Sequence, residues 1–212
     1  MTIPKLVDHH LNNSKHHVFF RDDSNNIYKG LETHRAILRA SQYIQDQVPS
    51  NDNVIAHLLE NEPLTYSTIF KGCVTSGNIA LALSNRNSVP AVVDLLKKTD
   101  CHYIIYSSTS IQLTQTVKAV KDELSKQGFE LNLVESPSIN LLFPKLGNER
   151  EEDLFNVQLK PLPSKFEDDN KVVIILHSSG TSSFPKPIAI TNKSVRSWAI
   201  VTTSNFDKHK KR

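Results

Sequence analysis

A short hydroxyl-rich segment with one lysine is the part of this sequence best suited to chemistry. Residues 178–187 read SSGTSSFPKP and directly follow the unbroken apolar run 172–176. Such a run predicts a strand covered on both faces, and open α/β sheets usually bind ligands beyond the carboxyl ends of their strands. Phosphate oxygens need several donors and a positive charge within one concave loop. The candidate phosphate-binding residues are therefore Ser178, Ser179, Gly180, Thr181, Ser182, Ser183 and Lys186.

One well-known phosphate loop, Walker A, is excluded because it requires the pattern G-x-x-x-x-G-K-[ST]. Here prolines flank Lys186 on both sides, and no hydroxyl residue follows it. The structural alternative is a serine-rich turn that is stabilised by its own hydroxyl–backbone hydrogen bonds. The ordered combination of hydroxyls, glycine, proline and lysine favours a nucleotide loop over that alternative.

The segment resembles the signature loop of the adenylate-forming (AMP-binding) superfamily, which includes acyl-CoA synthetases and the adenylation domains of non-ribosomal peptide synthetases. The family loop reads roughly [ST]-[SG]-G-[ST]-[TS]-G-x-P-K-[GP], followed by an apolar strand and T-H-x-[NSA]. Residues 178–182, the pair Pro185-Lys186, Thr191 and Ser194 match these positions. A loop that begins His-Ser-Ser-Gly and ends Pro-Lys-Pro-Ile looks like the fungal synthetase-like and reductase-like branches.

The resemblance also extends upstream, and it has two departures within the loop region. Residues 53–77 look like the family's strand, asparagine turn and helix, and residues 83–88, LSNRNS, resemble its L-x-P-R-N-S step. Ser183 stands where the family loop has its second glycine, and Asn192 replaces the usual histidine. A glycine permits a positive φ, so a serine at that position is expected to stiffen the loop.

The resemblance implies an enzyme that joins a carboxylate to ATP and releases pyrophosphate. In that reaction Thr181, Ser182 and Ser183 would hold the β- and γ-phosphates, and Lys186 would orient the leaving pyrophosphate. The implied cofactors are ATP and Mg²⁺, and the implied substrate is a small carboxylate. No catalytic residue and no metal ligand is assigned, because the family's Y-G-x-[TS]-E motif, ribose-binding aspartate and C-terminal lysine have no counterpart in the printed sequence.

Two functions therefore stay open from the sequence. The first is the N-terminal part of an ATP-dependent carboxylate-adenylating ligase, inactive or feeble by itself. The second is a non-catalytic binding or interaction module that has kept the adenylation scaffold. Such a module would dock a protein partner or a second copy through unpaired sheet edges and exposed apolar faces. A coding sequence beyond Arg212 that contains the tyrosine motif would favour the first function.

The elements that must position the loop follow from alternating strand and helix patterns. They predict an α/β fold with a mostly parallel or mixed sheet and helices on both faces, as in a partial N-terminal domain of the adenylate-forming fold. The expected strands cover residues 54–59, 79–83, 102–106, 129–134 and 172–176, and a second short strand is expected directly after the hydroxyl loop. The expected helices cover residues 31–48, 63–76, 89–99, 109–127 and 193–203, with Ser88 and Asn192 as caps and Gly77 and Gly128 as terminators.

The sequence predicts a division of the chain into three parts. Residues 1–29 are expected to be a poorly ordered lead-in, residues 30–204 the partial AMP-binding domain, and residues 205–212 a basic tail. Four prolines and a charge run at 149–153 predict an irregular excursion over residues 136–170, with the charges in solvent.

Composition excludes several other classes of protein. A net charge of +3 with scattered basic residues argues against nucleic-acid binding. Cys73 and Cys101 form no C-x-x-C pair, which favours buried, reduced thiols. No apolar run approaches the roughly 18 residues that a membrane span needs, and the first residues lack a signal-peptide pattern. We therefore expect a cytoplasmic protein without a membrane span.

Overall fold

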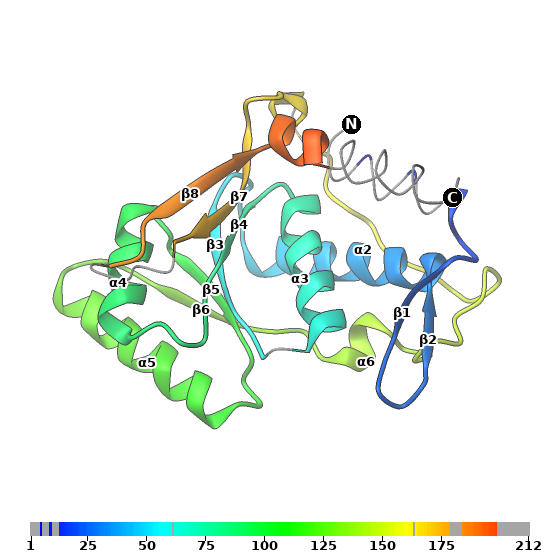
Figure 1. The fold of residues 1–212 in the computed structure, drawn as a ribbon, viewed down its shortest axis with the longest axis horizontal. Coiled ribbons are helices and arrows are strands. Elements are labelled where there is room, and N and C mark those ends of the chain that lie inside the picture. Colours follow the sequence, from blue (N-terminus) through cyan, green and yellow to red (C-terminus); the bar gives the residue numbers. More distant parts are fainter. Residues whose placement is uncertain are drawn as a thin grey trace, which may run out of the picture.

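A six-stranded mixed sheet forms the centre of the molecule (Figure 1). The computed structural model describes residues 5, 9, 13–60, 62–162, 164–178 and 184–198. The strand order is β6-β5-β3-β4-β7-β8, and every neighbouring pair is parallel except β7 and β8. The bounds are β3 Val54–Leu58, β4 Ile79–Ala82, β5 Tyr103–Tyr106, β6 Asn132–Glu135, β7 Val172–His177 and β8 Pro187–Thr191.

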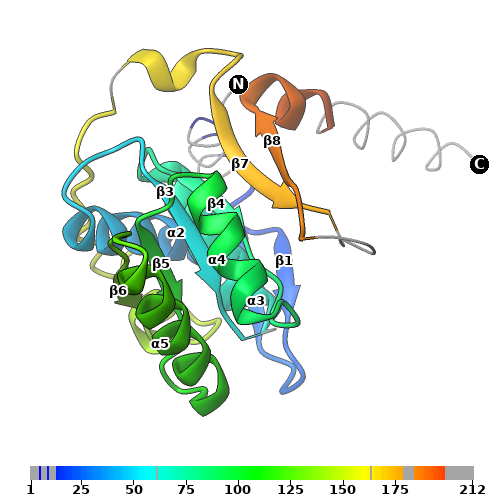
Figure 2. The same ribbon diagram turned by 90° about the vertical axis from the view of Figure 1, so that its left-hand side faces the viewer.

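Helices cover both faces of this sheet, which confirms the expected fold class. The helices are α2 Gly30–Gln47, α3 Pro63–Thr75, α4 Val89–Lys98 and α5 Ile111–Lys126. Successive strand residues point to opposite faces, so Ile55 joins the core under α2 and α3, whereas Ala56 joins the core under α4 and α5. Figure 2 shows α4 and α5 in front of the strands.

Two glycines end helices as the sequence predicts. Gly77 has a φ of 87°, and the next amide, of Asn78, donates to the Cys73 carbonyl at 3.2 Å. Gly128 has a φ of 71°, and the amide of Phe129 donates to the Leu124 carbonyl at 3.0 Å. Both arrangements satisfy carbonyls of the last helical turn through a left-handed residue, which is the position that favours glycine.

The cap that was expected at Ser88 is not formed. Ser88 occupies the N-cap position of α4 with extended backbone, but its side chain makes no capping hydrogen bond. The strand expected over residues 129–134 also begins later, at Asn132. Phe129 instead stacks on His102, with ring centroids 4.3 Å apart.

Part of the expected lead-in is ordered. Residues 18–29 form a β-hairpin of β1 (Val18–Arg21) and β2 (Ile27–Lys29), so the prediction of poor order is wrong for this segment. Tyr28 is only 1% exposed and packs edge-to-face on Phe143, with centroids 5.1 Å apart. This aromatic contact joins the hairpin to a residue more than a hundred positions away, which local polarity does not reveal. The domain limits themselves stay a prediction.

The excursion contains two short helices, α6 (Ile139–Leu142) and η1 (Ser164–Glu167). Its charge run was expected in solvent, and this is wrong for Glu149, whose side chain is 1% exposed. The Glu149 carboxylate accepts hydrogen bonds from Arg35 and Arg39 of α2. These arginines are four residues apart and therefore lie on one face of the helix, where they form a paired site for one carboxylate.

The two cysteines, Cys73 and Cys101, are buried free thiols, as expected. Strand β7 is covered less fully than predicted, because Leu176 is 37% exposed although Val173 and Ile175 are buried. The register partner of Leu176 on β8 is Ile188, which is 47% exposed. Among the described residues, no helix has the length and apolar character needed to cross a bilayer.

Candidate phosphate-binding site

The neck of the candidate loop lies between the carboxyl end of β7 and the start of β8. The Ser178 amide donates to the Lys186 carbonyl at 3.0 Å, and the Lys186 amide donates to Ser178 Oγ at 3.0 Å. These two bonds close the base of the loop and use the Ser178 hydroxyl as an acceptor. The other predicted residues, Ser179, Gly180, Thr181, Ser182 and Ser183, lie outside the described residues.

Lys186 presents its side chain to solvent at this neck. Pro185 is buried and Pro187 is partly buried, whereas Lys186 is exposed. A residue that precedes a proline is restricted to extended backbone, and each proline has a fixed φ. Within the described part of the chain, Lys186 forms no ion pair. The flanking prolines therefore restrict the backbone of an exposed lysine that has no ionic partner among the described residues, at the carboxyl edge of the sheet.

A histidine joins this neck to the turn between β4 and α4. His177 Nδ1 donates to the Ser178 carbonyl at 3.0 Å, and Asn87 Nδ2 lies 3.2 Å from His177 Nε2. Sequence reasoning gave neither His177 nor Asn87 a role. The two residues are 90 positions apart, and their contact depends on β4 and β7 being neighbours in the sheet.

The same contact brings the beginning of α4 close to the loop. Asn87 directly precedes Ser88, the N-cap residue of α4. Helix N-termini carry unsatisfied amide groups and the positive end of the helix dipole, which stabilise nearby anions. Arg86, the exposed residue before Asn87, adds its positive charge to that of Lys186 near the neck. The described surroundings of the neck are therefore suited to an anionic ligand.

The residue that caps the helix after β8 is Thr191, not Asn192. Thr191 Oγ1 accepts from the Ser194 amide at 3.3 Å. Asn192 is buried, and its amide group donates to the carbonyls of Phe166 and Asp168 at 3.0 and 2.9 Å. The Asn192 side chain, expected to be a cap, thus links the start of this helix to η1 and to Asp168. The final residues of the expected helix, from 199 onward, lie outside the described residues.

A cavity of about 500 Å³ lies at the carboxyl ends of β3, β5 and β6. Its lining includes three carboxylates, Glu60, Glu62 and Glu135. The Glu62 carboxylate accepts from the amides of Leu64 and Thr65 at the start of α3. Because like charges repel, this cavity is poorly suited to a carboxylate substrate.

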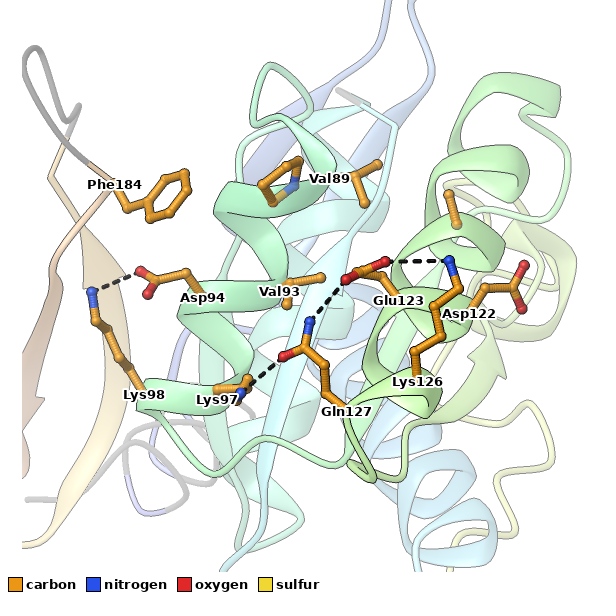
Figure 3. Close-up of a pocket in the computed structure, with 12 residues that line it drawn as sticks. Val89, Val93, Asp94, Lys97, Lys98, Asp122, Glu123, Lys126, Gln127 and Phe184 are labelled. Carbon is orange, nitrogen blue, oxygen red and sulfur yellow. Dashed lines mark hydrogen bonds and ion pairs between the residues drawn. The ribbon is translucent and has the colours of Figure 1, made fainter.

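A larger cavity, of about 940 Å³, runs between α4 and α5, with Phe184 at its edge (Figure 3). Two of its three lysines pair with carboxylates, and the third, Lys97, donates to the Gln127 side chain at 2.9 Å. Lys98 Nζ lies 2.7 Å from Asp94 Oδ2, and Lys126 Nζ lies 3.4 Å from Glu123 Oε2 (Figure 3). The lining also includes three carboxylates, Asp94, Asp122 and Glu123, so the groove suits a polyphosphate less well than the neck at Lys186 does.

ATP and Mg²⁺ differ in how well the described residues suit them. The Ser178 hydroxyl, the amides at the start of α4 and the Lys186 ammonium group fit phosphate oxygens. In the described part of the chain, no group of three or more His, Cys, Asp or Glu side chains could hold a metal ion. The structure therefore assigns no magnesium ligand.

An open α/β sheet with a lysine-bearing hydroxyl loop at its carboxyl edge is typical of nucleotide-binding enzymes. Residues 7–211 match the family described as AMP-binding enzyme, and the chain belongs to this family. An adenylate-forming reductase, Nps11 of Serpula lacrymans var. lacrymans, is 31% identical over 195 residues, covering 89% of this chain and 17% of that protein. A carboxylic acid reductase of Neurospora crassa is 27% identical over 163 residues, covering 76% of this chain and 13% of that protein.

Solved structures show the same fold at lower identity. A Mycobacterium tuberculosis fatty acyl CoA synthetase aligns with a TM-score of 0.67 and 16% identity, covering 93% of this chain and 37% of that one. The N-terminal domain of FACL13 from the same organism aligns with a TM-score of 0.70 and 14% identity, covering 92% and 45%. The chain thus has the N-terminal fold of adenylate-forming enzymes. It spans 16–18% of the length of three adenylate-forming reductases that it resembles.

Proposed function

We propose that this chain supplies the phosphate-binding part of an ATP-dependent carboxylate-adenylating ligase. The observation that carries the proposal is the neck between Ser178 and Lys186, where the exposed Lys186 lies at the carboxyl edge of a sheet with helices on both faces and forms no ion pair with a described residue. Binding sites of open α/β folds lie at this edge. The match to fungal adenylate-forming reductases supports the same assignment.

The proposed reaction is attack of a carboxylate oxygen on the α-phosphorus of ATP. The bond from that phosphorus to the bridging oxygen breaks, an acyl-adenylate forms, and pyrophosphate leaves with the bonding electrons. Negative charge grows on the leaving oxygens, and a fixed cation stabilises it most in the transition state. Lys186 would supply this cation, while Ser178, Ser179 and Gly180, with Thr181, Ser182 and Ser183, would surround the phosphates. Mg²⁺ would neutralise further phosphate charge when bound.

The chain by itself is expected to have little or no adenylating activity. In the family that the sequence resembles, the motifs that contact adenine and ribose and that supply the catalytic lysine are ones that these 212 residues do not contain. The substrate class that we propose, a small carboxylate, therefore belongs to an enzyme that includes those motifs. A cytoplasmic location is part of the same proposal.

Calorimetric titration with ATP, inorganic triphosphate and AMP tests which part of the nucleotide the loop binds. If the neck holds the β- and γ-phosphates, ATP and triphosphate will bind with similar affinity and AMP at least ten-fold more weakly. Equal binding of AMP and ATP would contradict the assignment. Separately, pyrophosphate exchange with a panel of acids tests the expected lack of activity, and incorporation by this chain alone would overturn it.

A second candidate function, an interaction module, is supported by the exposed edge of the sheet. Leu176 and Ile188 are cross-strand partners that are 37% and 47% exposed, and Phe184 before β8 is 48% exposed. Strand β8 has a hydrogen-bonded neighbour on one side only in the described sheet, and such edges readily pair with other chains. Sedimentation of the wild type and of Ile188→Ser would separate the cases: concentration-dependent association lost in the variant supports the module, and a monomer in both contradicts self-association.

A further inference from the structure

We propose that His177 is a positioning residue that fixes the neck of the phosphate loop by linking it to Asn87. The predicted effect on nucleotide affinity rests on the proposed function, whereas the hydrogen bonds that link the three segments do not depend on it. His177 is the last residue of β7, and the loop begins immediately after it. Asn87 belongs to a different part of the chain, the turn that leads into α4.

The hydrogen-bond partners determine which nitrogen of the imidazole carries the proton. The Ser178 carbonyl can only accept, so His177 Nδ1, 3.0 Å away, must donate. The Asn87 amide group faces the other nitrogen, His177 Nε2, at 3.2 Å and donates to it. The ring is therefore a neutral imidazole with its proton on Nδ1, and both nitrogens are used.

This arrangement is connected directly to Lys186. The Ser178 residue whose carbonyl binds His177 also exchanges two hydrogen bonds with Lys186, through its amide and its hydroxyl. Residues His177 and Pro187 are themselves register partners across β7 and β8. The chain of contacts Asn87–His177–Ser178–Lys186 thus fixes the backbone that carries the proposed phosphate-binding ammonium group. A correctly held donor loses less conformational entropy on binding, which increases affinity.

The role is positional, because His177 has no nitrogen left for a ligand. Arg86 precedes Asn87 in the chain, and Lys186 precedes Pro187, the register partner of His177; both charged residues are exposed. Among the described contacts of His177, neither partner is a carboxylate. The bond network, and not an ion pair, therefore holds the ring.

The tautomer can be observed by nitrogen-15 NMR of the imidazole ring at neutral pH. We expect a proton on Nδ1 and an accepting Nε2 in the wild type, with the Nε2 signal shifted in Asn87→Ala. Amide hydrogen exchange at Ser178 and Lys186 provides a second readout, which should be accelerated in His177→Ala. His177→Asn places an amide nitrogen near the position of Nδ1, so it should restore slow exchange in part. A control variant is His102→Asn, since His102 also binds a backbone carbonyl but precedes β5, which is separated from β7 by β3 and β4 in the sheet.

Coupling between the two residues is measured by ATP affinity in a double-mutant cycle. Each net hydrogen bond corresponds to roughly a five-fold change in affinity, so Asn87→Ala should weaken ATP binding about five-fold and His177→Ala about ten-fold or more. In the His177→Asn background, the side chain no longer reaches Asn87, and Asn87→Ala should have no further effect. Additive losses would overturn the coupling.

The outcomes separate this inference from the proposed function. If the wild type does not bind ATP, the proposed function fails, and the tautomer and exchange data still decide whether His177 fixes the neck. If ATP binds but the ring is protonated on Nε2, or exchange at Ser178 and Lys186 is unchanged in His177→Ala, the inference is wrong and the proposed function stands.

Discussion

Glu149 and Arg39 form a buried ion pair although 110 residues separate them in the chain. Arg39 Nη1 lies 2.9 Å from Glu149 Oε2, and the two side chains are 13% and 1% exposed. Arg35 Nη1 binds the other carboxylate oxygen at 2.9 Å, and both guanidinium groups lie about 5 Å from the ring of Phe155. The Glu149 carboxylate therefore helps to hold the excursion against α2, together with bonds from the same two arginines to backbone carbonyls of residues 142, 150 and 151.

Removal of this carboxylate should destabilise the fold strongly. Glu149→Gln removes the carboxylate that pairs with two largely buried guanidinium groups, and loss of one partner of a buried pair typically costs about 3–5 kcal/mol. The free energy of unfolding in urea measures this cost. Glu152→Gln is the matched control. The Glu152 side chain is 71% exposed, and its Oε1 lies as far as 3.8 Å from Arg150 Nη1, so loss of this charge should cost about 0.5 kcal/mol or less. Equal costs for the two variants would contradict the account of the ion pair.

The buried histidine of β3 should make the protein less stable in acid. His57 is 0% exposed, burial lowers its pKa to about 3, and among the described residues neither ring nitrogen has a hydrogen-bond partner. The unfolded chain binds a proton near pH 6.5, whereas the folded state does not until about pH 3. Stability must therefore fall as the pH is lowered through this window, by at most about 1.4 kcal/mol per pH unit from this group.

His57→Leu removes this contribution and should flatten the pH dependence of the free energy of unfolding between pH 6.5 and 3. The matched control is His16→Leu, since the His16 side chain is 83% exposed. If His57→Leu and the wild type lose stability in parallel over this range, the histidine is not buried in its neutral form.

The two helix-terminating glycines should differ in how they tolerate alanine. Both have a positive φ, which costs a side-chain-bearing residue about 1 kcal/mol. At Gly77 an added Cβ would also lie 2.6 Å from Leu162 Cδ2, whereas at Gly128 it would meet nothing within 4 Å. Leu162 Cδ2 is the end of a flexible side chain and can shift, so Gly77→Ala should cost about 0.5 kcal/mol more than Gly128→Ala in thermal or urea unfolding. A larger loss at Gly128 would show that the contact with Leu162 is unimportant.

Much of the scaffold could be predicted from local patterns. Apolar stripes on α2 to α5 and the runs of β3 and β7 depend only on residues near in sequence, so their limits were predicted to within about two residues. Glycine terminators were predictable for the same reason, because a left-handed residue is a local requirement.

The missed features all depend on contacts between distant segments. Glu149 was predicted to be solvated because its arginine partners lie more than a hundred residues away, on α2. Tyr28 lies in a polar stretch of sequence, which does not indicate its contact with Phe143. The contact of Asn87 with His177 required knowledge that β4 and β7 are neighbours. For the loop itself, the sequence identified Ser178 and Lys186, which the structure brings together at the neck.

The measurement that tests the central claim most directly is thermal protection by ATP. Lys186 is proposed to bind the polyphosphate, and a charge-assisted hydrogen bond lost at that position should weaken ATP binding about ten-fold. The rise in Tm at a fixed ATP concentration should therefore be clearly smaller in Lys186→Ala than in the wild type, with an unchanged Tm in the absence of ATP. Lys118→Ala, at an exposed position of α5, should keep the full rise. An equal rise in Tm for the wild type and Lys186→Ala would contradict the claim that this lysine binds the phosphates of ATP.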